Sequence, residues 1–221
     1  MKLFLSAIGK FALGVVLVGV LIFLPAGALA FWQGWLLMGV LFAPMFVAGL
    51  VMLWKRPDLL KRRLQAKEKR KTQDLVVKCS GLMFIAGFIL AGFNHRFGWY
   101  TLPTAASIVG AVCFMTAYAL YAEVMRENAY LSRTIEVSEG QKVVDTGLYG
   151  IVRHPMYTVT LLLFLSMPIV LGSIFAFPIF CFYPILIVKR IKDEEKLLEE
   201  ELDGYLAYKK KVKYRLIPLV W

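Results

Sequence analysis

Long apolar runs separated by short polar segments dominate this chain. Four of these runs lie near residues 11–31, 33–54, 79–97 and 101–122, and each approaches the roughly 20 residues that a helix needs to cross a hydrocarbon core of about 30 Å. A fifth run, 156–188, is longer, but three prolines and a Gly-Ser pair interrupt it. The pattern predicts an all-α, polytopic transmembrane bundle of six spans, the fifth of them short, with a cytosolic C-terminal helix. Five spans, with one kinked or re-entrant segment within 156–188, is the alternative.

Composition and charge agree with a membrane protein. The 221 residues are 59% apolar, whereas soluble domains average about 45–50%. With six spans and an inside N-terminus, every one of the 26 Lys and Arg residues except Arg96 falls on one side, and cytoplasmic loops are the ones that carry such an excess. We therefore expect an integral membrane protein with both termini cytoplasmic. The net charge of +11 indicates topology and attraction to anionic lipid, and argues against nucleic-acid binding.

Two polar segments divide the chain. Residues 55–78 are strongly basic with leucines spaced among the charges, which predicts an amphipathic segment on the cytoplasmic leaflet, with a plain solvated loop as the alternative. Residues 126–153 form the largest polar connection, expected to be irregular with a short extended piece near 134–137. We accordingly expect N-terminal transmembrane helices over 1–125, including the basic loop 55–78, followed by a cofactor-binding core over 126–221.

Several residue types invite a functional role that the pattern does not favour. Cys79, Cys113 and Cys181 lie singly in apolar segments, which is typical of buried small hydrophobic residues rather than of disulfides, and no structural metal site is expected. His95 lies in an outer turn, where an interfacial or hydrogen-bonding role is expected. The Gly-x-Gly-x-x-Gly fingerprint of soluble dinucleotide folds is missing, so a nucleotide-like cofactor must be held in some other way.

Residues 145–157 and 190–195 are the candidate site. The first segment places Arg153, His154 and Tyr157 at the start of an apolar run, and the second ends the next run with two adjacent glutamates. A helical hairpin over 156–190, which begins near Pro155, reverses at the Gly172-Ser173 turn and ends near Arg190, would bring the two segments together at the membrane surface.

The two glutamates are not equivalent on a helical wheel. At about 100° per residue, Glu195 falls within an apolar stripe of residues 187–205 and Glu194 lies at its edge. A carboxylate on an apolar face is costly to bury unless it is paired or binds a cation, so Glu195 is the expected ligand-facing residue. Taken singly, each motif also has a structural explanation: a charged, solvated helix around Glu194, and an arginine that reaches lipid phosphate beside a proline that begins a helix.

The two motifs together, Arg-His-Pro-x-Tyr followed some thirty-five residues later by Glu-Glu, resemble the integral-membrane methyltransferases typified by isoprenylcysteine carboxyl methyltransferase and phosphatidylethanolamine N-methyltransferase. The resemblance covers roughly residues 120–221, and the closing Tyr-x-x-Tyr and Tyr-Arg-Leu-Ile-Pro also match. It implies S-adenosylmethionine as cofactor. Matching the motifs residue by residue gives the expected cofactor-binding residues Tyr149, Arg153, His154, Pro155, Tyr157, Glu194 and Glu195, and the expected substrate-binding residues Tyr205 and Tyr208.

Methyl transfer from this cofactor is an in-line displacement that needs alignment and exclusion of water more than an acid, a base or a metal. Arg215 is a candidate for neutralising an anionic acceptor and Asn128 for orienting one. A lipophilic acceptor that enters from the bilayer is expected: an isoprenylcysteine-like carboxylate, a phospholipid amine or a thiol. The alternatives are a membrane reductase with a nicotinamide cofactor, and a non-catalytic membrane scaffold or small transporter.

Overall fold

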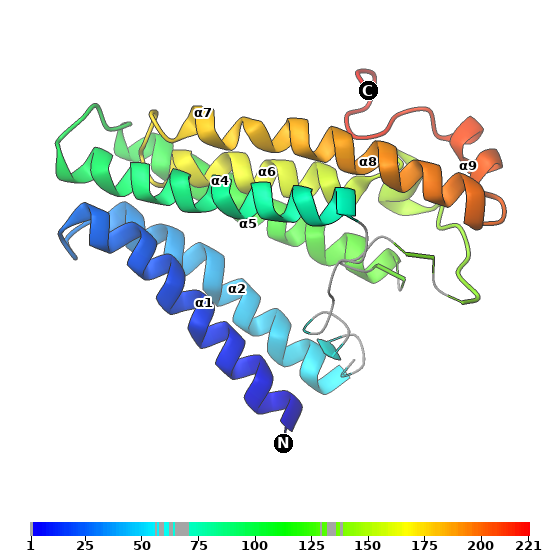
Figure 1. Cartoon of the computed structure of the whole chain (residues 1–221), viewed down its shortest axis with the longest axis horizontal. Helices are drawn as coiled ribbons and strands as arrows, with labels where there is room; N and C mark the ends of the chain where they lie inside the picture. Colours follow the sequence, from blue (N-terminus) through cyan, green and yellow to red (C-terminus); the bar gives the residue numbers. More distant parts are fainter. Residues whose placement is uncertain are drawn as a thin grey trace.

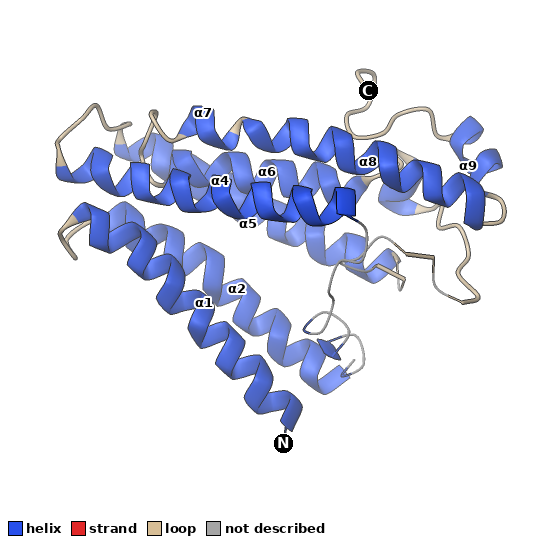
Figure 2. Cartoon of the chain, viewed as in Figure 1, coloured by secondary structure: helices blue, strands red, loops and turns tan. Residues whose placement is uncertain are grey.

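The described part of the chain is helical. A computed structural model describes residues 2–55, 57, 60–61, 64, 71–128, 130–131, 136–137 and 139–221. Within these residues there are no strands beyond one isolated bridge between Thr101 and Ser173, and Figure 2 shows helices throughout the molecule. The all-α fold class predicted from the apolar runs is confirmed.

In the described part of the chain, four helices are long and apolar enough to cross a membrane. They are α1 (Lys2–Ala26), α2 (Trp32–Lys55), α4 (Lys71–Arg96) and α5 (Thr104–Glu127). The second half of the chain contains η1 (Gly147–Gly150), α6 (Pro155–Val170), α7 (Phe177–Phe180), α8 (Phe182–Glu201) and α9 (Tyr205–Lys211). With 16 residues, α6 is the predicted short fifth segment, and the return arm is divided between α7 and the apolar start of α8.

The helices α4, α5, α6 and α8 run side by side, and α1 and α2 form a pair that meets them at one end and diverges toward the other (Figure 1). A shared core of aromatic and aliphatic side chains joins them, with Phe114 and Phe180 fully buried. Phe84 on α4 contacts Phe164 on α6 and Phe180 at the end of α7. The bundle therefore positions the α6–α8 hairpin against α4 and α5.

The hairpin reverses at the predicted turn. Gly172 has a φ of +66°, a conformation that glycine adopts without steric cost, and its carbonyl accepts a hydrogen bond from the Leu102 amide. Ser173 is buried and donates to the side chain of Asn94. Nearby, His95 stacks on Phe31 at a centroid distance of 4.3 Å. These contacts join the end of α4, the start of α5 and the end of α6.

Two helices extend further than the apolar runs suggested. Helix α1 begins at Lys2 rather than near residue 11. The predicted basic loop 55–78 is shorter than expected, because Lys71–Lys78 form the first turns of α4. Gln73 and Val76 on these turns are buried, and Gln73 donates to Asp193 on α8, so tertiary packing extends the helix beyond its apolar part.

Other expectations fall partly outside the described residues or are wrong. Much of 56–70 lies outside them, and so do residues 134–135 of the predicted extended piece. The prediction of buried cysteines is wrong for Cys181, which is exposed where α7 gives way to α8, and Cys79 and Cys113 are half-buried.

The close approach of α1 to α4 generates a prediction. A Cβ at Gly92 would lie 2.6 Å from the Ile22 carbonyl oxygen, whereas nothing lies within 4 Å of one at Gly81 on the same helix. We expect Gly92→Ala to lower stability by about 1–3 kcal/mol through overpacking. Gly81→Ala, the matched control, should leave the apparent melting temperature in detergent unchanged or raise it, because alanine is the better helix former. Equal melting temperatures for the two variants would contradict this contact.

Candidate functional site

The Arg153-His154-Pro155 segment is fixed in place by the C-terminal tail. The Arg153 amide donates to the Tyr214 carbonyl and the His154 amide to the Arg215 carbonyl, both at 2.9 Å. One turn into α6, the Thr158 hydroxyl donates to the Leu216 carbonyl. Pro155 occupies the first turn of α6, where its missing N–H has no helical partner to lose. The tail thus runs along the start of α6.

Glu195 on α8 is the centre of a buried charged cluster. Its side chain is 3% exposed, and its Oε1 accepts from Arg153 Nε at 2.7 Å and lies 3.3 Å from His154 Nε2. Its Oε2 accepts from Arg215 Nε at 2.8 Å. Arg153 also donates through one terminal nitrogen to the carbonyls of Val212 and Lys213. The cluster therefore joins α8, the segment before α6 and the C-terminal tail.

Charge pairing decides the ionisation of Glu195. Burial by itself would raise the pKa of this carboxyl group, but hydrogen bonds from His154, Arg153 and Arg215 outweigh burial and hold the pKa well below its ordinary value. A carboxylate that accepts several charged hydrogen bonds is stabilised in its ionised form. Glu195 is therefore an anion in the folded protein at neutral pH.

Glu194 belongs to a second polar chain. The Tyr157 hydroxyl donates to Glu194 Oε2 at 2.5 Å and accepts from Arg190 Nε at 2.9 Å. Arg190 also lies over the Tyr157 ring, 5.9 Å from its centroid. Because Arg190 and Glu194 are four residues apart on α8, they share one face of that helix. This chain positions Glu194 from the side of the membrane hairpin.

Asn128 and three tyrosines also line the site. Asn128 follows the last turn of α5 and donates to the Tyr149 hydroxyl at 3.0 Å. Tyr208 donates to the Tyr149 carbonyl at 2.7 Å. Burial, above all, raises the pKa values of Tyr149, Tyr205 and Tyr208, so all three remain neutral phenols at neutral pH.

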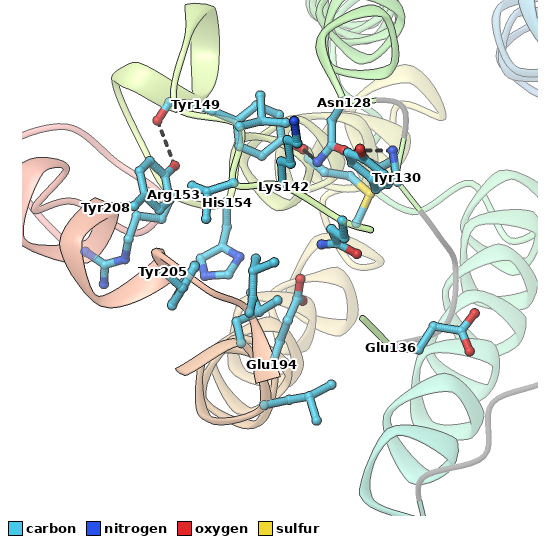
Figure 3. A pocket seen from close by; sticks show the side chains of 18 of the residues that line it. Asn128, Tyr130, Glu136, Lys142, Tyr149, Arg153, His154, Glu194, Tyr205 and Tyr208 are labelled. Atoms are coloured by element: carbon cyan, nitrogen blue, oxygen red, sulfur yellow. Dashed lines mark hydrogen bonds between the residues drawn. The ribbon is translucent and has the colours of Figure 1, made fainter. Parts of the chain in front are cut away.

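These groups surround an open pocket (Figure 3). The cavity itself has a volume of about 110 Å³ and continues into an open mouth. The polar residues of its wall are Asn128, Tyr130, Glu136, Gln141, Lys142, Tyr149, Arg153, His154, Tyr157, Arg190, Glu194, Tyr205 and Tyr208. Leucines, valines and Met156 complete it. Figure 3 shows Tyr205, His154 and Glu194 on one side, and Asn128 and Tyr130 on the other.

The structure brings most of the predicted site residues to this pocket, but Glu194 rather than Glu195 is the glutamate that lines it. The buried stripe of α8 does contain Glu195, but that carboxylate faces Arg153, His154 and Arg215 behind the wall, while Glu194 lines the pocket. Two other predicted residues, Pro155 and Arg215, are not among the residues that line the pocket. The physical reason is that the tail supplies cations for Glu195, which the helical wheel could not show.

Sequence reasoning assigned no role to five of the polar wall residues. Arg190 was detectable, because it lies one helical turn before Glu194 and next to the apolar stripe. The other four are Tyr130, Glu136, Gln141 and Lys142. They come from the irregular connection before η1, where no hydrophobic periodicity indicates which way a side chain points.

The wall fits a cofactor with separate charged and flat parts. S-adenosylmethionine has a cationic sulfonium, an amino-acid end that carries both charges, and an adenine ring. The pocket offers a carboxylate at Glu194, aromatic faces, and hydrogen-bond donors and acceptors. It also contains a buried Tyr205 hydroxyl with no hydrogen-bond partner among the described residues, which is rare unless a ligand or water completes it.

Residues 107–200, which run from α5 through most of α8, match the model of the isoprenylcysteine carboxyl methyltransferase (ICMT) family. The protein is ICMT-like. A solved structure of the eukaryotic intramembrane Ras methyltransferase ICMT has the same fold, with a TM-score of 0.59 and 18% identity over 97% of this chain and 77% of that one. The ICMT-like fold and the long apolar helices identify a multi-pass integral membrane protein in a lipid bilayer.

The ICMT-like chain also resembles two sterol reductases in sequence. It is 31% identical to the Delta(14)-sterol reductase of Mus musculus over 91 residues, which are 40% of this chain and 22% of that protein. It is 29% identical over 153 residues to a protein described as a probable 7-dehydrocholesterol reductase of Acanthamoeba polyphaga mimivirus, covering 64% of this chain and 34% of that protein. The ICMT-like chain therefore spans about a third or less of the length of these relatives.

The Glu195 cluster predicts a pH-dependent loss of stability on mutation. Glu195→Gln would leave two arginines with no buried anion, and removing one partner of a buried ion pair costs about 3–5 kcal/mol. Because the folded pKa of Glu195 lies below its ordinary value of 4.5, its stabilisation is complete above that value and is lost as the pH falls below it. Melting temperatures in detergent, followed from pH 7 down to about pH 3, should thus decline less steeply for Glu195→Gln than for the wild type.

The control is Glu200→Gln, since Glu200 is exposed on the same helix. It should follow the wild-type curve. If Glu195→Gln has the wild-type melting temperature at pH 7, the cluster does not stabilise the fold.

Proposed function

We propose that this protein is an S-adenosylmethionine-dependent methyltransferase of the membrane, which transfers a methyl group to a lipophilic or membrane-presented acceptor. The observation that carries the proposal is the convergence of the two motifs on one pocket: Tyr157 of Arg-His-Pro-x-Tyr contacts Glu194 of Glu-Glu, and Arg153 contacts Glu195. Both contacts lie within the segment that matches the ICMT family.

In this proposal the wall residues divide the work of holding the cofactor. Glu194 attracts its cationic part, and the tyrosines provide flat, partly apolar surface. Arg153, His154 and Glu195 hold the wall in shape. The bound cofactor supplies an electrophilic methyl group, so the chain's own residues need only align the acceptor and exclude water. The absence of a need for an acid or a base agrees with the site, because its charged side chains form hydrogen bonds and ion pairs with one another.

The acceptor is proposed to reach the pocket from the bilayer side. Tyr157 and Arg190 lie where α6 and α8 leave the apolar hairpin, so the pocket lies at the boundary between polar and apolar surroundings. Asn128, which already orients Tyr149, is the proposed acceptor-orienting residue. Arg215 pairs with Glu195 and lies 5.1 Å from the Trp221 ring centroid, so its proposed role is structural rather than direct contact with an acceptor.

We also propose that the pocket and both termini face the cytoplasm, because the basic residues concentrate on that side of the predicted topology. A nicotinamide-dependent reductase is the second candidate, favoured by the sterol reductase similarity. The methyltransferase is preferred because the matched family and the shared fold of the solved structure both point to it.

Calorimetric titration of the detergent-purified protein tests the proposal. We expect saturable binding of S-adenosylmethionine and S-adenosylhomocysteine, and no competition by NADPH. Glu194→Gln should weaken S-adenosylmethionine binding about 10-fold or more, since a hydrogen bond to a charged group contributes about 1.5–3 kcal/mol.

Glu200→Gln, on the exposed face of α8, is the matched control and should bind as the wild type does. Failure of the folded wild type to bind either compound would overturn the methyltransferase. In that case, NADPH binding would support the reductase, and no binding of any of the three would leave a scaffold.

A further inference from the structure

Tyr205 has a buried hydroxyl group that no neighbouring residue satisfies. Tyr205 begins α9, lines the pocket and is 3% exposed. Its hydroxyl has no hydrogen-bond partner among the described residues. Buried polar groups in native proteins are nearly always bonded, and each exception needs an explanation.

The other tyrosines of the wall show that this is not a general feature of the pocket. Tyr149 accepts from Asn128, and Tyr208 donates to the Tyr149 carbonyl. Tyr157 bonds both Glu194 and Arg190. Tyr205 lines the same pocket but lacks a described protein partner for its buried hydroxyl.

The surroundings of Tyr205 determine what it would bind. Burial, above all, raises the pKa of the Tyr205 hydroxyl, and the nearby carboxylates of Glu195 and Glu194 raise it further. The hydroxyl therefore stays protonated and can donate a hydrogen bond. Arg153 directs its own N–H groups to Glu195 and to the carbonyls of Val212 and Lys213. An anionic ligand group at this end of the pocket would therefore meet the Tyr205 hydroxyl as a donor that no protein acceptor occupies.

We propose that the Tyr205 hydroxyl donates a hydrogen bond to the carboxylate of the amino-acid end of the bound S-adenosyl cofactor, with Glu194 on the side of its positive charges. The inference rests on the proposed function. It moves Tyr205 from acceptor binding to cofactor binding, and it divides the pocket: the amino-acid end lies beside Tyr205, His154 and Glu194, and the remainder extends toward Asn128 and Tyr130 (Figure 3).

A two-by-two comparison tests it, with the wild type and Tyr205→Phe each titrated with S-adenosylmethionine and with decarboxylated S-adenosylmethionine, which lacks only the carboxylate. Affinities too weak for direct titration are obtained by competition with S-adenosylhomocysteine. Tyr205→Phe should bind S-adenosylmethionine about 10-fold or more weakly, as for a lost hydrogen bond to a charged group. It should bind the decarboxylated compound as the wild type does.

Two further variants separate binding from folding. Tyr205→Phe removes a hydroxyl that forms no protein hydrogen bond, so its melting temperature without ligand should equal or exceed that of the wild type. Tyr208→Phe removes a formed hydrogen bond and should lower that melting temperature. Tyr214→Phe, whose side chain lies outside the described pocket wall, should change neither the affinity nor the melting temperature.

The outcomes are distinct. Unchanged affinity of Tyr205→Phe for S-adenosylmethionine overturns the inference, and so does an equal loss for the decarboxylated compound, which would place the contact on another part of the cofactor. If the folded wild type binds neither S-adenosylmethionine nor S-adenosylhomocysteine, the proposed function itself fails, and the inference fails with it.

Discussion

The buried carboxylate of Glu195 is the group on which the C-terminal half of the molecule depends. It accepts charged hydrogen bonds from Arg153 and Arg215, which belong to different segments of the chain. Burying a carboxylate is costly unless it is paired, and the buried Arg153 side chain needs that anion in turn. The Arg153 side chain also donates hydrogen bonds to the carbonyls of Val212 and Lys213. One ionic cluster therefore fixes the start of α6, the middle of α8 and the tail.

Adjacent glutamates on a helix point about 100° apart, and this protein uses the two directions for different purposes. Glu195 points to the tail and the Arg153 segment, while Glu194 points to the pocket and is held by Tyr157. Under the proposed function, substituting either residue would reduce cofactor binding for a different reason: Glu195→Gln disrupts the wall, and Glu194→Gln removes a charge from it. Stability in the absence of ligand distinguishes them.

The sequence was sufficient to predict the helical class, the hairpin reversal at Gly172 and the meeting of the two motifs, because apolar runs, turn residues and helix periodicity are local properties. The sequence was insufficient where contacts between segments far apart in the chain determine which residues are buried. The wheel placed Glu195 on the buried stripe correctly, but only the tail reveals why it is buried and why Glu194 lines the pocket. Likewise, α4 begins at Lys71 because Gln73 meets Asp193 across the bundle, a contact that no local pattern encodes.

The chain of Glu194, Tyr157 and Arg190 connects the pocket to the membrane hairpin. Arg190 is buried where the apolar part of α8 ends, and it can remain charged there because Tyr157 and the surrounding polar wall solvate it. The aromatic ring of Tyr157 belongs to α6 and stacks on His154. A shift of α6 relative to α8 would therefore move Tyr157 and His154 relative to Glu194. Under the proposed function, an acceptor that enters between α6 and α8 would thus change the pocket wall directly.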